Sequence, residues 1–393
     1  MISFLQGDVF DNIKKLEDNS IDCVVTSPPY WGLRDYGVSG QLGLEPTYQE
    51  HIQNIVELFR AIKPKLKDSA TIWLNYGDSY AATVNGTKVK DQIKNKVQFA
   101  GKYLIDGDDR TFRDKPFSTI QGSLKPKDLV MIPNRIAIAL QDDGWWIRSE
   151  IIWHKPNPMP ESVRDRPTSA HEKIWLITKS KKYYYDANAI REPLTSSSIK
   201  RLNQDIKNQK GSTRANGGMK SNGNMKAICN IEGKNKRNVW TVTTKPFKDA
   251  HFATFPKDLI EPCIKAGCPE KVCVECGTPY KKNYKRQRIR RDELDPADPR
   301  YRPNKYKGGY EEINGKGDAG YQSSEFIGFE KDCNCETDKF EGGVVLDPFG
   351  GSGTTGIVAQ SLNRQAILIE LNKNYINIAK KRINKELGMF SGS

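Results

Sequence analysis

Short apolar runs, each followed by polar or glycine-rich residues, are the first pattern along the chain. Residues 21–25 and 344–346 form two such runs, and their length suits strands buried inside a sheet rather than helices. Between residues 48 and 66, apolar side chains recur at intervals of three and four, which is the spacing of a helix with one buried face. Alternating strands and helices of this kind predict an α/β fold with a mostly parallel sheet.

Further elements extend this pattern along the chain. We expect strand, helix and strand within residues 4–31, strands at 70–74, 145–153 and 366–369, and helices at 129–140 and 258–266. Residues 174–178 and 183–185 resemble the two arms of a hairpin, which would make the sheet mixed rather than purely parallel.

The composition indicates a basic protein. Lys and Arg number 62 against 48 Asp and Glu, which gives a formal net charge of +14 over 393 residues. Such a surplus favours a polyanionic partner, above all nucleic acid, because phosphate contacts release counterions. A merely soluble basic protein is the alternative. No stretch approaches the roughly 18 apolar residues of a membrane span, and the amino-terminal residues do not resemble a signal peptide. We therefore expect a cytoplasmic protein without membrane association.

A glycine-rich turn follows the second apolar run. It reads Asp-Pro-Phe-Gly-Gly-Ser-Gly-Thr-Thr from Asp347 to Thr355 and lacks the lysine that a nucleoside-triphosphate loop requires. Glu370 ends the next predicted strand, where a carboxylate can accept hydrogen bonds from both hydroxyls of a ribose. S-adenosylmethionine fits these features because it has a ribose and no phosphate. A tight turn without a ligand is the alternative.

The first apolar run leads into Ser27-Pro28-Pro29-Tyr30. An exocyclic amine of a base is a poor nucleophile because its lone pair is delocalised into the ring. Proline has no N–H and a fixed φ, so the Pro28 carbonyl is a rigid acceptor, and the Ser27 hydroxyl is a second one. Two acceptors match the two hydrogens of the amine. Tyr30 offers a ring on which an extruded base can stack, and we expect Trp31 to extend that surface. An ordinary structural turn is the alternative.

The two motifs, in this order, resemble those of the amino-group DNA methyltransferases, and more closely those of the permuted group called beta. The resemblance implies a Rossmann-like, S-adenosylmethionine-dependent methyltransferase fold with circularly permuted motif order, which methylates a base flipped out of duplex DNA. Ser at the first position of the tetrapeptide resembles the members that methylate cytosine N4. Adenine N6 is the alternative, and an inactive zinc-containing DNA-binding protein is the alternative from another class.

The resemblance also implies roles for individual residues. Cofactor binding is assigned to Asp347, Phe349, Gly350, Gly351, Ser352, Gly353 and Glu370. Asp8, in Gly-Asp-Val-Phe, matches a signature near the adenine of the cofactor, although a helix cap is equally typical of this position. Phe255 lies in a segment, residues 251–256, that resembles the one beside the cofactor, with core packing as the alternative. Residues 152–158, 164–168 and 171–172 resemble the central block that shapes the pocket for the flipped base.

Four cysteines form two close pairs. Cys273 and Cys276 are followed much later by Cys333 and Cys335. Four thiolates suit tetrahedral zinc, and four protein ligands leave no open position for water, so the metal would be structural. Free buried thiols are the alternative. We predict that the remaining cysteines are unliganded, namely Cys23, Cys229, Cys263 and Cys268.

Two basic stretches interrupt the periodic core and either contact nucleic acid or form solvated loops. We divide the chain into a catalytic half of the core at 1–185 with a polar insert at 84–126, a target-recognition region at 186–245, a cofactor-side helix segment at 246–272, a basic zinc-knuckle insert at 273–336, and a cofactor-binding half at 337–393. The implied partners are double-stranded DNA and a cognate restriction endonuclease, in restriction-modification or in protection of phage or host DNA. Monomer and homodimer both remain open.

Overall fold

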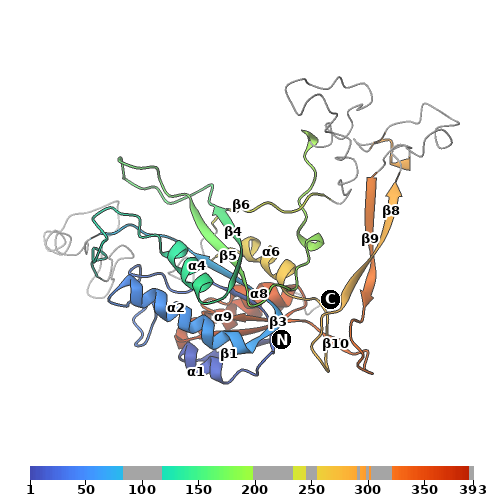
Figure 1. Ribbon diagram of the computed structural model, residues 1–393, viewed down its shortest axis with the longest axis horizontal. Coiled ribbons are helices and arrows are strands. Elements are labelled where there is room, and N and C mark those ends of the chain that lie inside the picture. The colour runs from blue at the N-terminus through green and yellow to red at the C-terminus, as the bar shows by residue number, and fades with distance from the viewer. Residues whose placement is uncertain are drawn as a thin grey trace. The chain divides into compact units, whose positions relative to one another are not determined.

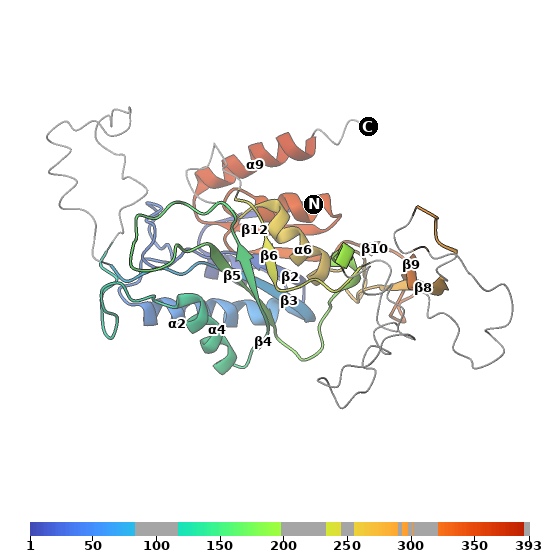
Figure 2. The same cartoon turned by 90° about the horizontal axis from the view of Figure 1, so that it is seen from above.

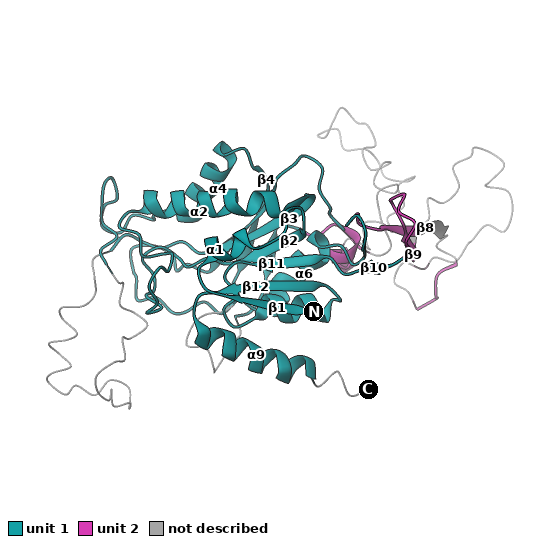
Figure 3. Ribbon diagram, turned by 90° about the horizontal axis from the view of Figure 1, so that it is seen from below, with its two compact units in different colours: residues 1–186, 237–277, 339–393 teal, residues 187–236, 278–338 magenta. Residues whose placement is uncertain are grey.

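The computed structural model describes residues 1–82, 117–197, 233–244, 255–289, 293–297, 301 and 321–388 (Figure 1). Much of the predicted polar insert and of the predicted recognition region lies outside the described residues, as do residues 251–254. The chain divides into two compact units (Figure 3). Unit 1 comprises residues 1–186, 237–277 and 339–393, and unit 2 comprises residues 187–236 and 278–338.

Unit 1 contains, among its described residues, an eight-stranded sheet of order β1-β12-β11-β2-β3-β5-β4-β6. In that order the strands are Ile2–Gln6, Gln365–Glu370, Val344–Asp347, Ile21–Thr26, Leu66–Tyr76, His171–Thr178, Trp146–His154 and Val239–Thr241. Neighbouring strands are parallel except where β5 pairs with β3 and with β4. The predicted mixed, mostly parallel sheet is confirmed.

Helices cover both faces of this sheet (Figure 2). One layer consists of α1 (Val9–Lys14), α2 (Tyr48–Ile62) and α4 (Ile132–Asp142). The other consists of α6 (Lys257–Gly267), α8 (Thr354–Ser361) and α9 (Lys373–Leu387). The central strand β2 is therefore covered on both sides, which explains why all its side chains are buried and its sequence is mostly apolar rather than alternating.

Local chemistry sets the ends of α2. The Thr47 hydroxyl accepts a hydrogen bond from the backbone N–H of Glu50 at 3.2 Å and so caps the first turn. Apolar residues at helical spacing then face the sheet and are fully buried, among them Ile55, Phe59 and Ile62. Pro64 follows in the 3-10 turn η1 (Lys63–Lys65), because proline cannot continue the α-helical hydrogen bonding. The chain then enters β3.

The predicted hairpin of residues 174–178 and 183–185 is wrong. β5 pairs with β3 and β4, while residues 183–185 have no strand conformation. The backbone N–H of Tyr184 donates to the carbonyl of Ser69 at 2.8 Å, and Tyr185 stacks on Trp73 with ring centroids 6.5 Å apart. These tyrosines are therefore packing residues, and their β propensity reflects half-buried surroundings rather than a strand.

Unit 2 includes an antiparallel ribbon of β8 (Lys281–Ile289) and β9 (Tyr321–Glu330). The aromatic rings of Tyr284, Phe326 and Phe329 pack edge to face along it. Lys282 lies over the rings of Phe326 and Phe329. In unit 1, the short strands β7 (Val272–Cys273) and β10 (Phe340–Glu341) pair with each other. Within the described ranges, none of the helices combines the length and apolar character needed to cross a membrane.

Candidate active site

The two predicted motifs follow neighbouring parallel strands. Val345 and Leu346 of β11 lie opposite Cys23 and Val24 of β2, so both strands end at the same edge of the sheet. Ser27 comes directly after β2, and the glycine-rich loop comes directly after β11. The carboxyl edge of a parallel sheet is where α/β proteins bind ligands. The fold thus brings the tetrapeptide and the loop together at a plausible binding edge.

A buried carboxylate joins the two strand ends. Asp347 is 1% exposed, and its Oδ1 accepts hydrogen bonds from the hydroxyl of Thr26 at 2.9 Å and from the N–H of Phe349 at 3.0 Å. Its Oδ2 accepts from the Thr355 hydroxyl at 2.6 Å. Burial raises the pKa of Asp347 to about 6, although these hydrogen bonds oppose the shift. The carboxylate therefore holds the loop and the end of β2 in one arrangement, and direct contact with a cofactor stays a prediction.

The glycines of the loop are required by its backbone geometry. Gly351 and Gly353 have φ angles of +49° and +78°, in the left-handed region that side chains disfavour. A Cβ at Gly350 would lie 2.9 Å from the Cβ of Leu368 on β12. The loop thus presents bare backbone, so a ligand can approach it closely at the start of α8.

Arg382 on α9 supports this loop from behind. One guanidinium nitrogen donates to the hydroxyl of Ser352 at 3.0 Å and to that of Thr354 at 2.8 Å. The Nε atom donates to Glu386 at 2.9 Å, and Glu386 also pairs with Lys257 at 2.7 Å. The hydroxyl of Ser352, predicted at the cofactor site, therefore accepts a hydrogen bond from the protein itself.

Glu370 ends β12 beside the loop, as the sequence predicts. Its Oε2 accepts from the N–H of Gly351 at 2.8 Å, and its Oε1 accepts from the N–H of Asn372 at 2.8 Å. Burial raises the pKa of Glu370 above its ordinary value. Each carboxylate oxygen keeps a second lone pair, so the group can still accept hydrogen bonds from two ribose hydroxyls.

Two other predicted cofactor residues have structural contacts. Asp8 caps α1, since its Oδ1 accepts from the N–H of Phe10 at 2.9 Å, which is the alternative that the sequence left open. The N–H of Gly7, the preceding residue, donates to the Glu370 carbonyl at 3.0 Å. Phe255 is half-buried immediately before α6. Contacts of Asp8 and Phe255 with a cofactor remain predictions.

The tetrapeptide is held against β3. Tyr30 stacks on Tyr76 with ring centroids 4.5 Å apart and planes at 27°, while Pro28 is buried and Ser27 is half-buried. Trp31 is only 1% exposed, and its indole N–H donates to the carbonyl of Glu45 at 2.9 Å. The expectation that Trp31 extends the stacking surface is therefore wrong, because its ring belongs to the core.

A polar network lies behind the tetrapeptide, and it includes Lys155 and Glu172 from the predicted base-pocket segments together with Asn75, which sequence reasoning missed. The Tyr30 hydroxyl donates to Oε2 of Glu172 at 2.8 Å, and the Ser27 hydroxyl donates to that of Tyr30 at 3.3 Å. The Asn75 amide donates to the Tyr30 hydroxyl and to Glu172, each at 2.9 Å. Lys155 pairs with the other oxygen of Glu172. The sequence signal for Asn75 is a polar amide near the end of an otherwise apolar strand, two residues before Gly77.

A second buried chain of hydrogen bonds lies on the other side of Tyr76. The two ring nitrogens of His51 contact Oε2 of Glu45 at 2.8 Å and the Tyr76 hydroxyl at 2.7 Å. That hydroxyl accepts from the backbone N–H of Trp31 at 2.8 Å. Burial alone would raise the pKa of Glu45, but its hydrogen bonds, first that from His51, bring it below the ordinary value. The backbone directly after the tetrapeptide is thus fixed from within the protein.

The model of the N6/N4 methyltransferase family, described as DNA methylase, matches residues 21–274 and 335–381. These ranges make up most of the chain and include both Ser27 and Asp347. The chain belongs to the DNA methylase family. It is similar to the type II methyltransferase M.SmaI of Serratia marcescens, at 36% identity over 377 residues that cover 96% of this chain and 89% of that one.

Another similar member of the DNA methylase family is the type II methyltransferase M.Cfr9I of Citrobacter freundii. It is 35% identical over 384 residues, which cover 98% of this chain and 88% of the relative. Among solved structures, the PvuII DNA methyltransferase (cytosine-N4-specific) aligns over 97% of this chain and 86% of its own, with a TM-score of 0.50 and 15% identity. At that identity the likeness shows a shared fold alone.

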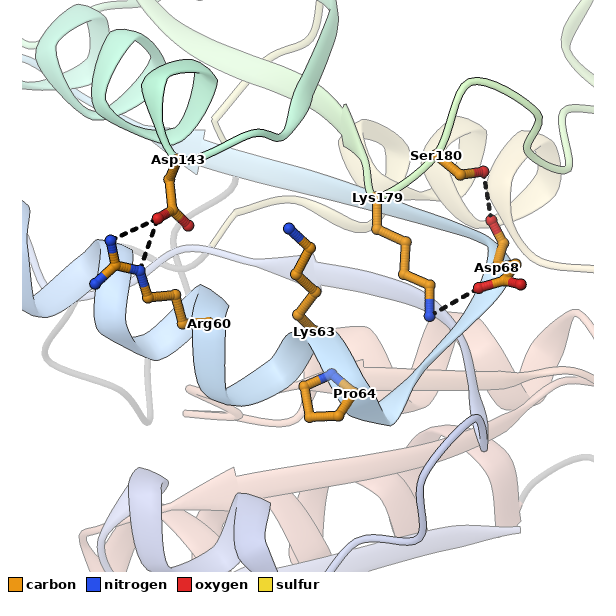
Figure 4. A pocket seen from close by; sticks show the side chains of 7 residues that line it. All are labelled: Arg60, Lys63, Pro64, Asp68, Asp143, Lys179 and Ser180. Atoms are coloured by element: carbon orange, nitrogen blue, oxygen red, sulfur yellow. Dashed lines mark hydrogen bonds and ion pairs between the residues drawn. The ribbon is translucent and has the colours of Figure 1, made fainter.

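The DNA methylase core also has a shallow hollow at the opposite edge of its sheet (Figure 4). Arg60 and Lys179, which line it, are paired with Asp143 and Asp68 at 2.6 and 3.0 Å. This hollow lies at the start of β3, whereas Asn75 lies near the end of that strand. It is therefore separate from the tetrapeptide and the glycine-rich loop.

The predicted zinc ligands of this DNA methylase are close together. The sulfur atoms of Cys273, Cys276, Cys333 and Cys335 all lie within 4.8 Å of one another. The turn after β7 is closed by a hydrogen bond from the N–H of Gly277 to the carbonyl of Cys273 at 2.8 Å. By contrast, burial raises the pKa of the Cys23 thiol to about 12, which suits a protonated packing residue. Cys229 lies outside the described residues.

Proposed function

We propose that this DNA methylase transfers a methyl group from S-adenosylmethionine to the N4 amine of a cytosine flipped out of a specific duplex sequence. The observation that carries the proposal is the hydrogen bond between Thr26 and Asp347. It joins the residue before the catalytic tetrapeptide to the first residue of the glycine-rich loop. An amine held by the tetrapeptide and a methyl donor held by the loop would therefore meet at one strand edge.

The loop and Glu370 suit S-adenosylmethionine, which when bound supplies a methyl group on a positively charged sulfur. The left-handed Gly351 and Gly353 leave backbone accessible on the side of the methionine portion. Glu370 would take the ribose hydroxyls with the lone pairs that Gly351 and Asn372 leave free. Asp8, Phe255 and Phe349 are proposed to line the same site. The order of the motifs along the chain fits the circularly permuted beta group.

The tetrapeptide suits an exocyclic amine. The Pro28 carbonyl and the Ser27 hydroxyl would accept its two hydrogens and draw its lone pair out of conjugation. Because Tyr76 covers one face of the Tyr30 ring, the flipped base would stack on the opposite face. Positioning and preorganised hydrogen bonding then account for most of the catalysis, without a covalent intermediate.

Cytosine is proposed over adenine because the tetrapeptide begins with Ser27. The PvuII enzyme, which is cytosine-N4-specific by name, shares the fold and supports this choice only at that level. The type II relatives support a role in restriction-modification beside a cognate restriction endonuclease. The net charge of +14 supports binding of double-stranded DNA.

The test is direct. The purified protein is incubated with unmethylated genomic DNA and labelled S-adenosylmethionine, and the nucleosides are separated by mass spectrometry. N4-methylcytosine is the expected product. N6-methyladenine would replace the cytosine assignment with the adenine one. If calorimetry detects cofactor binding but no methylated base forms, the proposed activity on DNA is overturned and an inactive core is favoured.

We also propose that the four clustered cysteines hold a structural zinc ion. The closeness of their sulfur atoms and their two-pair spacing support tetrahedral thiolate ligation. Metal analysis should find one zinc per chain in the wild type and in Cys229→Ser, and much less in Cys276→Ser and Cys335→Ser. Zinc-free wild-type protein with normal stability would overturn this proposal and favour free thiols.

A further inference from the structure

Glu172 lies at the end of a chain of hydroxyl groups that starts at the substrate side of the tetrapeptide. The Ser27 hydroxyl donates to the Tyr30 hydroxyl at 3.3 Å, which donates to Oε2 of Glu172 at 2.8 Å. The side chain of Glu172 is 16% exposed. Each donor in this chain points toward the carboxylate, so the hydrogen bonds have one direction.

The neighbours of the chain enforce that direction. Asn75 donates to both Tyr30 and Glu172 at 2.9 Å. The Tyr30 oxygen therefore acts as an acceptor toward Asn75, and its one hydrogen is given to Oε2 of Glu172. If the Asn75 amide were turned round, its oxygen would face the carboxylate at the same distance and repel it. Lys155 binds Oε1 of Glu172 and lies over the Trp153 ring at 4.4 Å. The carboxylate is thus fixed with Oε2 aimed at Tyr30.

The reaction proposed above releases a proton at this end of the chain. The amine nitrogen forms a bond to the methyl carbon, the carbon–sulfur bond breaks, and its electron pair stays on sulfur. The nitrogen is then positively charged and carries one hydrogen too many for the neutral methylamino product. Tyr30 cannot be the final acceptor of that proton, because burial first, and the charge of Glu172 second, raise its pKa well above the ordinary value and keep it a neutral phenol.

We propose that Glu172 is the terminal acceptor of this proton and acts through Tyr30 and Ser27. The amine gives its proton to the Ser27 oxygen, Ser27 gives its own to the Tyr30 oxygen, and Tyr30 gives its own to Oε2 of Glu172. Both hydroxyls end as they began, and the carboxylate becomes a carboxylic acid until solvent reclaims the proton. The inference rests on the proposed function, but it holds for an amine of cytosine or of adenine.

The test compares single-turnover methylation by wild type, Glu172→Gln, Tyr30→Phe and the double variant, with the dissociation constants of cofactor and DNA measured for each. Glu172→Gln keeps an oxygen that accepts from Tyr30, and Tyr30→Phe keeps the ring on Tyr76, so binding should change little. Each single variant should lose roughly 100-fold in the transfer rate. The double variant should lose no more than either one, because both interrupt the same chain.

The matched control is Glu150→Gln. Glu150 on β4 pairs with Lys173 on β5 at 2.7 Å, so this variant removes an ion pair nearby in the same sheet without touching Tyr30. Its transfer rate should match the wild type. If Glu172→Gln is unstable, Tyr30→Phe and the partial rescue of Glu172→Ala by added formate carry the test.

The outcomes separate the two proposals. If the wild type methylates no base, the proposed function itself is overturned, whatever the variants do. An active wild type with full-rate Glu172→Gln overturns the proton route alone. Losses that multiply in the double variant, or an absence of formate rescue, would also overturn the route and leave Glu172 as a structural partner of Lys155.

Discussion

Thr26 donates a hydrogen bond to Asp347 at 2.9 Å across 321 positions of sequence. Both groups are buried, at about 1% exposure. Since Ser27 follows Thr26 and the glycine-rich loop follows Asp347, a shift in either loop is transmitted to the other through this contact. On the proposed function, the geometry between amine and methyl donor would depend on this one buried pair.

Thr26→Val is the most direct test of the coupling between the two loops. Valine fills the same volume but leaves Asp347 without one of its donors, so the free energy of unfolding should fall by about 1–3 kcal/mol. Cofactor affinity should weaken as well, because the loop loses a restraint. Urea unfolding and calorimetry measure the two effects. Unchanged values for both would mean that the hydrogen bond does not couple the loops.

The raised pKa of Asp347 predicts a pH dependence of stability. An ordinary value of 3.8 applies to the unfolded chain and about 6 to the folded one. Between these values the folded state binds more protons, so stability falls as pH rises through about 6, and almost none of this contribution is left at about pH 7. From pH 5 to pH 7 this contribution amounts to about 1 kcal/mol. Asp347→Asn should lack it, and the difference between the two urea-unfolding profiles measures the effect; parallel profiles would reject it.

The strands that carry the site were predictable because burial on both faces leaves a short, mostly apolar run in the local sequence. The buried β2 and β11 appear as apolar runs, and Glu370 ends a strand as expected. The contacts between distant segments were not predictable. Trp31 has the same aromatic character as Tyr30, yet the fold buries it, and Asn75 and Glu172 meet only because β3 and β5 pair.

Arg382→Ala should weaken cofactor binding about tenfold. The arginine holds the hydroxyls of Ser352 and Thr354, and without it the loop gains freedom that binding must then remove. Lys381→Ala is the matched control, since Lys381 is exposed on the same helix. Titration calorimetry measures the cofactor dissociation constant of each variant. Equal affinities in the two variants would show that Arg382 supports stability only.

Gly77→Ala should abolish most methyl transfer while leaving cofactor affinity near normal. A Cβ there would lie 2.7 Å from the Tyr30 ring and 3.2 Å from the Glu172 carboxyl carbon, so one of them must move. Gly388→Ala, where a Cβ meets nothing within 4 Å, is the control. Single-turnover methylation is the measurement. A fully active Gly77→Ala would argue against a role for this packing.

Glu370→Gln should raise the cofactor dissociation constant about tenfold. The amide keeps one acceptor oxygen but has an NH2 group in place of the other. This NH2 group cannot accept the hydrogen bond that Asn372 or Gly351 donated to the lost oxygen, and it cannot accept one from a ribose hydroxyl. Glu57→Gln on the exposed face of α2 should bind as the wild type does. Comparison with an analogue lacking the ribose hydroxyls adds a second check, because Glu370→Gln should discriminate less against it.

The strand order has a consequence for synthesis of the enzyme. β1 and β2 are made first, but in the finished sheet they are separated by β12 and β11, which are made last. A nascent chain that has emerged only as far as β10 therefore has its tetrapeptide without the strand that anchors Thr26. We therefore expect a chain that lacks β11 and β12 to have no cofactor loop beside its tetrapeptide and to methylate no DNA until the last β-α-β segment is in place between β1 and β2.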